Sequence, residues 1–306
     1  MKKYFLNITI FFAVVISIDY VFGKVCDNML LHAKGGENKQ LVDLCRNDHY
    51  DMLIMGSSKA HHNYIPRVFT DALSFSCYNA GYDGNGIILA YGILSLMDED
   101  KLPKLIIYDV KQQFDIYSYN GDGDYTRYYQ KIKKFYGNAA VDSIIGSIDE
   151  QDLIKLRSGL VRYNGDLLNT ISNYFKTSGK DGRYGYKPAV GQLEDDIPQE
   201  KDYSEDLDVI KMNYFKKFIQ FTKEKGIDLI VVFSPEYKTP FSDDFQPIRD
   251  LCNLEGVQVI DCFEEQDFQR IEYYKDHCHL NEIGSKVFTE KIVTILSQNN
   301  GSKNVE

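Results

Sequence analysis

Asp51-Met-Leu-Ile-Met-Gly-Ser-Ser58 places a short apolar run directly before a glycine and two serines. The run is apolar throughout and bounded by turn residues, which is typical of a strand covered on both faces of a parallel sheet. Four other runs have the same character, at residues 75–79, 105–110, 229–233 and 257–261. We therefore predict a five-stranded, mainly parallel sheet.

Helical patterns alternate with these strands, at about residues 66–73, 86–97, 209–225, 245–254 and 281–297. Such alternation predicts an α/β fold, a three-layer α/β/α sandwich of flavodoxin-like type with helices on both faces of the sheet. Residues 115–208 interrupt the alternation and contain many tyrosines. We predict a mixed helix and loop insertion there.

The composition restricts the class of protein. The 306 residues are 43% hydrophobic and 26% charged, which is enough apolar content to bury a substantial core and excludes a disordered chain. The formal net charge of -10 would repel a phosphate backbone, so we expect no nucleic-acid partner.

The N-terminus predicts export. Lys2 and Lys3 precede an apolar segment at residues 4–22. The segment fits either a signal peptide cleaved before Lys24 or an uncleaved membrane anchor. We favour the anchor, with residues 24–306 outside the cytoplasm as one domain that carries the insertion.

Six cysteines accompany this segment and allow two interpretations. In an oxidising compartment, Cys26 could pair with Cys45 and Cys252 with Cys262. Alternatively, several of them are buried thiols that pack as small apolar residues.

Three segments carry residues suited to catalysis. Ser57 and Ser58 follow the first strand, where ligands bind in open parallel sheets, although either serine could simply cap a helix. The glycine-rich turn at residues 79–86 could direct backbone amides toward an oxyanion. Asp276 and His279 are spaced so that the carboxylate can orient the imidazole as a base toward a serine.

A metal site is the alternative use of the same histidines. Asp276, His277 and His279 could ligate a zinc ion together with His61 and His62. Their spacing matches no familiar zinc motif, so we expect neither a metal nor another cofactor.

In combination, the segments resemble the SGNH (GDSL-like) hydrolase superfamily. Gly-x-Ser, Asn-x-Gly-x-x-Gly and Asp-x-x-His occur here in the order found in that superfamily. The resemblance implies that Ser58 is the nucleophile, that Gly84 and the Ser58 amide line the oxyanion hole, and that Asp276 and His279 complete the triad. Ser57 occupies the position of the aspartate in the Gly-Asp-Ser motif that is usual in the superfamily.

The third conserved block departs from the superfamily. Lys111-Gln-Gln-Phe-Asp115 stands in place of Gly-x-Asn-Asp after the third strand. We expect Gln112 or Gln113 to supply the missing amide donor.

The layout is most similar to exported relatives that modify envelope polymers, such as proteins of alginate O-acetylation and teichoic acid D-alanylation. It implies a serine esterase or O-acyltransferase of the bacterial envelope that uses an acyl-serine intermediate. The implied partners are an acylated glycan or acyl donor, the membrane, and a membrane-bound acyltransferase. The alternative is a degenerate domain that binds glycan or organises an assembly without turnover.

The insertion supplies the candidate substrate-binding residues. Tyrosine rings can stack on sugars and arginines can pair with acidic groups. We therefore predict a polymer-binding wall formed by Arg127, Tyr128, Tyr129, Arg162, Tyr163 and Arg183. The alternative is that these side chains only pack the insertion.

Overall fold

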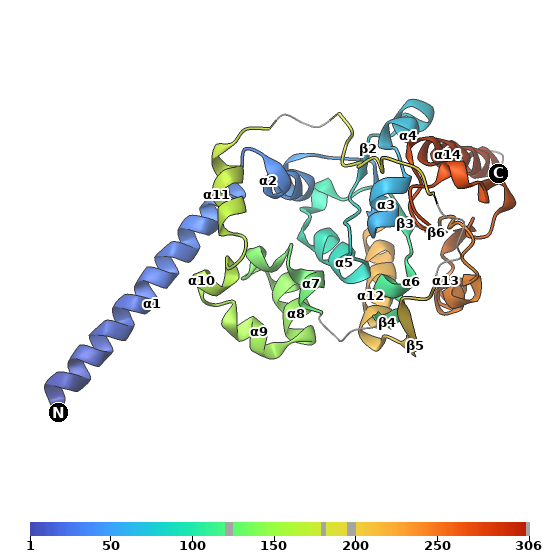
Figure 1. Ribbon diagram of the computed structural model, residues 1–306. Helices are drawn as coiled ribbons and strands as arrows, with labels where there is room; N and C mark the ends of the chain where they lie inside the picture. Colours follow the sequence, from blue (N-terminus) through green and yellow to red (C-terminus); the bar gives the residue numbers. More distant parts are fainter. Residues whose placement is uncertain (120–124, 179–181, 195–199, 304–306) are drawn as a thin grey trace. The chain divides into compact units, whose positions relative to one another are not determined.

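The computed structural model of the chain describes residues 1–119, 125–178, 182–194 and 200–303 (Figure 1). The chain forms two compact units. The helical unit comprises Met1–Asp48, Gly92–Asp98 and Tyr129–Gly179. The sheet unit comprises His49–Tyr91, Glu99–Tyr128 and Lys180–Glu306.

A five-stranded parallel sheet forms the centre of the sheet unit. Its strands follow the order β2 (Cys77–Asn79), β1 (Met52–Gly56), β3 (Leu105–Asp109), β6 (Asp228–Phe233) and β7 (Gln258–Asp261). Counted along this sheet alone, that order is 2-1-3-4-5, which is the flavodoxin-like order. The predicted α/β fold and all five predicted strands are therefore confirmed.

One face of the sheet is covered by α3 (Ser58–Asn63), α4 (Pro66–Leu73) and α14 (Glu282–Lys303) (Figure 1). Ile54, Ile107 and Ile230 are aligned across three neighbouring strands, because each is the register partner of the next. They form one buried cluster with Phe69 of α4 and Phe288 of α14. This packing orients α3, which starts directly after the first strand.

The other face carries α12 (Val209–Lys225) and α13 (Gln246–Glu255), with the first turns of α5 (Ile87–Leu96). Tyr108 of β3 contacts Phe215 and Phe218 of α12, with ring centroids 5.3 Å apart in both pairs. Helix α12 begins after Asp208, whose carboxylate accepts hydrogen bonds from two amides of its first turn, and ends at Gly226 with φ of 66°. Its predicted bounds are confirmed.

The region predicted as an insertion differs from expectation. It contains a two-stranded antiparallel sheet of β4 (Tyr117–Tyr119) and β5 (Tyr203–Leu207), which a helix and loop prediction missed. The strands are short and mostly polar, so their periodicity was too weak to detect; the Tyr117 ring stacks on Tyr203 at 5.3 Å. The region is also divided, because Tyr129–Gly179 belongs to the helical unit.

The helical unit is built around α1 (Lys2–Leu31), which runs unbroken through the predicted end of the membrane segment. Among the described residues, α1 is the one helix long and apolar enough to cross a membrane. Gly23, Cys26 and Leu30 form its buried stripe, and α1 packs against α10 and α11. The other α-helices of the unit are α2 (Gly36–Val42), α8 (Ala139–Ile148), α9 (Glu150–Lys155), α10 (Gly159–Arg162) and α11 (Leu167–Phe175).

Short elements complete the two units. They are η1 (Asp43–Asn47), η2 (Glu99–Lys101), α6 (Gln112–Asp115), α7 (Thr126–Tyr129), η3 (Lys133–Phe135), η4 (Ser242–Phe245), η5 (Gln266–Phe268) and η6 (Ile271–Tyr273).

All six cysteines are free thiols, and five of them are buried. The pairs Cys26–Cys45 and Cys252–Cys262 are not formed. The structure therefore agrees with the interpretation of the cysteines as packed thiols.

We expect Phe215→Ala to lower the free energy of unfolding by about 3–5 kcal/mol, because it leaves a cavity beside Tyr108. Val209→Ala, at an exposed position of the same helix, is the control and should have little effect. Chemical denaturation of the full chain in detergent, followed by circular dichroism, measures both. Equal effects would contradict the packing described for α12.

Candidate active site

The turn after β1 positions two serines at the carboxyl edge of the sheet. Gly56 has φ of 139°, and a Cβ atom there would lie 2.4 Å from the carbonyl oxygen of Asp109. Glycine is therefore required, because a larger residue would push β1 away from β3. The chain then turns directly into α3.

Ser57 and Ser58 have different roles in this turn. Ser57 is fully buried and is the N-cap of α3, because its hydroxyl accepts a hydrogen bond from Lys59 N at 3.3 Å. The hydroxyl of Ser58 lies 2.7 Å from Nε2 of His279. The geometry therefore assigns the cap to Ser57 and leaves Ser58 to face the histidine.

Asp276 completes the arrangement expected from the sequence. Its carboxylate oxygens lie 2.9 and 2.8 Å from Nδ1 of His279, and the carboxylate also accepts from the backbone amides of Cys278 and His279. A carboxylate can only accept, so Nδ1 carries hydrogen and Nε2 of neutral His279 is free to accept from Ser58. The structure thus brings Ser58, His279 and Asp276 into one hydrogen-bonded chain.

The electrostatics of this chain favour a strong base. Burial alone would raise the pKa of Asp276, but the hydrogen bond and charge of His279 and the backbone amides hold it well below its ordinary value. Burial would lower the pKa of His279, but Cys278 and Asp276 outweigh it and raise that pKa to about 10. His279 therefore accepts a proton readily once it is neutral.

Side chains of α3 and α14 fix the loop that carries His279. Oδ1 of Asn63 accepts from the amide of Leu280 at 2.9 Å, and the hydroxyl of Ser285 donates to the carbonyl oxygen of His62 at 2.8 Å. These bonds connect α3 to the residue after His279 and to the last helix. Ser58 and the loop that carries His279 are therefore held by the same short helix.

The glycine-rich turn after β2 is tied to the serine turn. Nδ2 of Asn79 donates to the carbonyl oxygen of Ala60 at 2.7 Å, and Tyr82 N donates to that of Gly56 at 3.1 Å. Gly84 has φ of 68°, a left-handed conformation that favours glycine. Within the described residues, the amides of Ser58 and Gly84 donate to no acceptor, so both are available to a ligand oxygen.

The third block is held by its aspartate. Asp115 is buried, and its carboxylate accepts from the amides of Ile87 and Lys111 and from the hydroxyl of Tyr108. Burial is the main reason that its pKa rises to about 6, although these hydrogen bonds oppose the shift. Asp115 therefore joins the end of β3 to the start of α5.

Gln112 and Gln113 lie buried in α6, and Oε1 of each has no hydrogen-bond partner in the described structure. Within the described residues, neither glutamine side chain forms a hydrogen bond with Ser58. Their role as oxyanion donors stays a prediction.

A buried charged cluster lies beneath the serine turn and was missed by the sequence analysis. Oε1 of Glu236 accepts from Nζ of Lys59 at 2.9 Å and from Nζ of Lys111 at 2.8 Å. The side chains of Glu236 and Lys59 are 0% exposed. Burial would raise the pKa of Glu236, but the two lysines outweigh it and lower that pKa to about 2.

The backbone around Glu236 connects this cluster to the loop that carries Asp276 and His279. Tyr237 N donates to the carbonyl oxygen of His277 at 2.8 Å. Nδ1 of His277 lies 3.0 Å from the carbonyl oxygen of Tyr237. The sequence does contain a sign of this cluster. Lys59, Lys111 and Glu236 each lie two or three residues after the end of a parallel strand, so all three are near the same edge of the sheet.

The histidines considered for a metal form two groups rather than one. Asp83 contacts Nδ1 of His61 at 2.8 Å and Nε2 of His62 at 3.2 Å, while Nζ of Lys187 lies 2.7 Å from its other oxygen. His62 also packs edge to face on His279, at 5.1 Å between ring centroids. The proposed ligand set of Asp276, His277 and His279 is not assembled, because His277 points to Tyr237.

Two groups of side chains nevertheless have ligand atoms close enough to hold a metal ion. They are His61 with His62 and Asp83, and Asp276 with Cys278 and His279. In the first, the ammonium of Lys187 already supplies positive charge to Asp83. In the second, the ligand atoms are engaged in the hydrogen-bonded chain to Ser58.

Four of the predicted substrate-binding residues are buried, and their role in substrate binding stays a prediction. Tyr129 donates to Asp152, and Arg162 and Tyr163 both bind Asp27. The fourth residue, Tyr128, has the ammonium of Lys211 over its ring. Carboxylate partners allow such amphipathic side chains to be buried, which residue counts could not reveal.

Arg127 and Arg183 remain candidates. The guanidinium of Arg127 lies 3.0 Å from where a Cβ atom on Gly84 would be, so this half-buried side chain borders the candidate oxyanion turn. Arg183 is exposed. A role for either in substrate binding stays a prediction.

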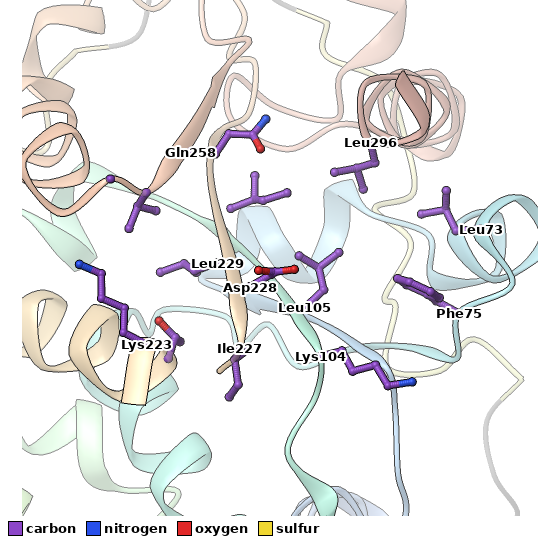
Figure 2. Close-up of a pocket in the computed structure, with 14 residues that line it drawn as sticks. Leu73, Phe75, Lys104, Leu105, Lys223, Ile227, Asp228, Leu229, Gln258 and Leu296 are labelled. Atoms are coloured by element: carbon purple, nitrogen blue, oxygen red, sulfur yellow. The ribbon is translucent and has the colours of Figure 1, made fainter. Parts of the chain in front are cut away.

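A cavity of about 520 Å³ lies away from Ser58, His279 and Asp276 (Figure 2). Leu105, Asp228 and Gln258 line it at the amino ends of β3, β6 and β7. This is the opposite edge of the sheet from Ser58. Ligands of open parallel sheets bind at the carboxyl edge, so we assign no catalytic role to this cavity.

Glu236→Gln removes the charge that balances two buried lysines. We expect it to lower the free energy of unfolding by about 3 kcal/mol or more. Glu255→Gln, which breaks the surface pair with Lys223, is the control and should change the unfolding midpoint little. Equal midpoints for the two variants in a denaturant titration would show that the cluster contributes nothing.

No protein-family profile and no curated protein matches the chain. Solved structures similar to it include a lipolytic protein of the G-D-S-L family from Desulfitobacterium hafniense, at 9% identity and a TM-score of 0.40, covering 80% of this chain and 99% of that one. An acetyl xylan esterase has 13% identity and a TM-score of 0.38, covering 80% and 98%. An acylhydrolase from Bacteroides fragilis has 11% identity and a TM-score of 0.36, covering 88% and 91%. The α/β fold follows from the chain's own parallel sheet and flanking helices, and the similarity to these GDSL-type hydrolases is remote.

Proposed function

We propose that the chain is a serine-dependent esterase or O-acyltransferase of SGNH type. The observation that carries this proposal is the continuous hydrogen-bonded chain from Ser58 through His279 to Asp276 at the carboxyl edge of the sheet. A serine, an imidazole that can accept its proton and a carboxylate that orients the imidazole, in this order, are what nucleophilic acyl transfer requires.

The proposed reaction begins with attack by Ser58 on an ester. His279 takes the proton of the hydroxyl as its oxygen bonds to the acyl carbon, and the amides of Ser58 and Gly84 stabilise the oxyanion. His279 then returns the proton to the departing alcohol oxygen, which leaves an acyl-serine. Water or a sugar hydroxyl releases the acyl group with His279 acting again as base, so hydrolysis and transfer differ only in the acceptor.

We further propose that the enzyme is anchored in the membrane and acts outside the cytoplasm on acyl groups of an envelope or exported polysaccharide. The support is α1, an apolar helix whose most apolar window is 0% buried. Asp19 and Gly23 of this helix contact α10, and cleavage before Lys24 would remove both contacts. An anchor in the membrane would place the site beside a membrane-bound acyltransferase that supplies the acyl group. We therefore favour acyl transfer over hydrolysis.

One observation favours a second candidate. The third block has no asparagine, and the amide oxygens of Gln112 and Gln113 have no partners in the described structure. A domain that binds glycan without turnover is consistent with that departure. It does not explain the alignment of three catalytic groups within hydrogen-bonding distance.

Ser58→Ala should reduce turnover of a chromogenic acetyl ester by about a thousandfold or more, because the nucleophile is lost. Ser57→Ala is the matched control: it loses a helix cap worth about 1 kcal/mol, so its melting temperature should fall while turnover persists. Turnover retained in Ser58→Ala and lost in Ser57→Ala would assign the nucleophile to the neighbouring serine.

The pH dependence of kcat/KM tests the base. His279 must be neutral to accept a proton, and its pKa is raised to about 10, so activity should increase with pH into the alkaline range. Asp276→Asn removes a carboxylate that raises this pKa. The acidic limb should therefore move to lower pH in that variant, while the maximal rate falls by about 10³–10⁴. An unshifted limb would show that Asp276 does not act on His279.

A further inference from the structure

The short helix α10 of the helical unit carries two exposed apolar residues directly after its first residue, Gly159. Leu160 is 56% exposed and Val161 is 43% exposed. The two residues that follow are different, because Arg162 and Tyr163 are buried and bind the carboxylate of Asp27. Along α10, the side chains therefore change from apolar and exposed to polar and paired.

The start of α10 is fixed to one level of α1. The carboxylate of Asp19 accepts from the hydroxyl of Ser158 at 2.9 Å and from the amides of Gly159 and Leu160 at 3.2 and 2.8 Å. Four residues along α1, Gly23 touches Gly159 so closely that a Cβ atom on Gly159 would lie 2.5 Å from its Cα. Leu160 therefore lies level with Asp19.

That level lies inside the apolar segment. Residues 4–22 rise about 28 Å as a helix, which matches the roughly 30 Å of a bilayer's hydrocarbon core. Asp19 lies in the last turn of this span, where an unpaired carboxylate would be costly, and α10 provides its hydrogen bonds. Tyr20 and Lys24 follow, with the ammonium 5.7 Å from the ring centroid, which is a pair typical of the membrane interface.

Asp27 marks the side toward water. It lies five residues beyond Phe22, and there it pairs with Arg162 at 3.0 Å. Asp19 thus binds the amides of Gly159 and Leu160, whereas the Asp27–Arg162 pair lies farther from the apolar segment.

We propose that the start of α10, with Leu160 and Val161, inserts into the same lipid leaflet from which α1 emerges. This inference rests on the proposed membrane anchor. Lipid is the occupant that fits, because the exposed side chains lie at the depth of the apolar segment and Asp19 connects the two backbones. The helical unit then contacts the hydrocarbon through both α1 and the start of α10, instead of through α1 alone.

The far end of α11 provides an internal comparison. Phe175 is 67% exposed and therefore as accessible as Leu160. Lys34 N, however, donates to the carbonyl oxygen of Asn173, so this part of α11 is level with residue 34. Residue 34 follows the end of α1 at Leu31, which is itself about 14 Å of helix rise beyond Phe22. Phe175 should accordingly lie outside the hydrocarbon.

Single tryptophans test this depth order, because the natural chain contains none. The full chain carrying Ile10→Trp, Leu160→Trp or Phe175→Trp would be reconstituted in phosphatidylcholine–phosphatidylglycerol vesicles with and without brominated acyl chains. We expect bromine to reduce emission at least about twofold for Ile10→Trp and Leu160→Trp, which lie at hydrocarbon depth, and far less for Phe175→Trp. Val161→Trp replaces Leu160→Trp if circular dichroism shows the latter misfolded.

Quenching of Ile10→Trp without quenching of Leu160→Trp or Val161→Trp would overturn the inference. Blue-shifted but unquenched emission from those variants would do so as well, since it would show that a protein partner covers the site. An unquenched Ile10→Trp would overturn the anchor and this inference together. Acetyl ester turnover in the same samples reports separately on the proposed activity.

Discussion

The balance of charge between Glu236, Lys59 and Lys111 is the constraint on which the site depends. A carboxylate that is 0% exposed is costly unless it is paired, and here one oxygen accepts from two ammonium groups. The three residues come from the segments that directly follow β1, β3 and β6. Their pairing therefore fixes the relative positions of three strand ends, and the segment next to Glu236 is hydrogen-bonded to the loop that carries Asp276 and His279.

Catalytic geometry follows from this framework. Gly56 allows the sharp turn out of β1, Ser57 caps α3, and Ser58 is left facing His279. Because α3 also holds the catalytic loop through Asn63, a shift of that helix would move the serine and the histidine together. Such shared support keeps Ser58 and His279 within hydrogen-bonding distance, as the proposed nucleophile and base require.

Local patterns predicted the sheet well, because buried parallel strands are continuous apolar runs and α12 carries both its cap and its terminal glycine. They also predicted which serine, histidine and aspartate would meet. The β4–β5 pair escaped detection because its strands are short and polar. The burial of Tyr129, Arg162 and Tyr163 could not be predicted, because their carboxylate partners, Asp152 and Asp27, are 23 residues and more than 100 residues away in the sequence. The Glu236 cluster likewise joins residues that only the fold brings together.

Covalent labelling of the proposed nucleophile, Ser58, is the most direct test of the central claim. The full chain would be incubated with a fluorophosphonate, which mimics the tetrahedral intermediate and stays attached to an activated serine, and the adduct would be located by peptide mass spectrometry. The account predicts a single adduct on Ser58, formed faster as pH rises and His279 becomes neutral. An adduct on Ser57 or another residue, or no adduct on the folded protein, would contradict it.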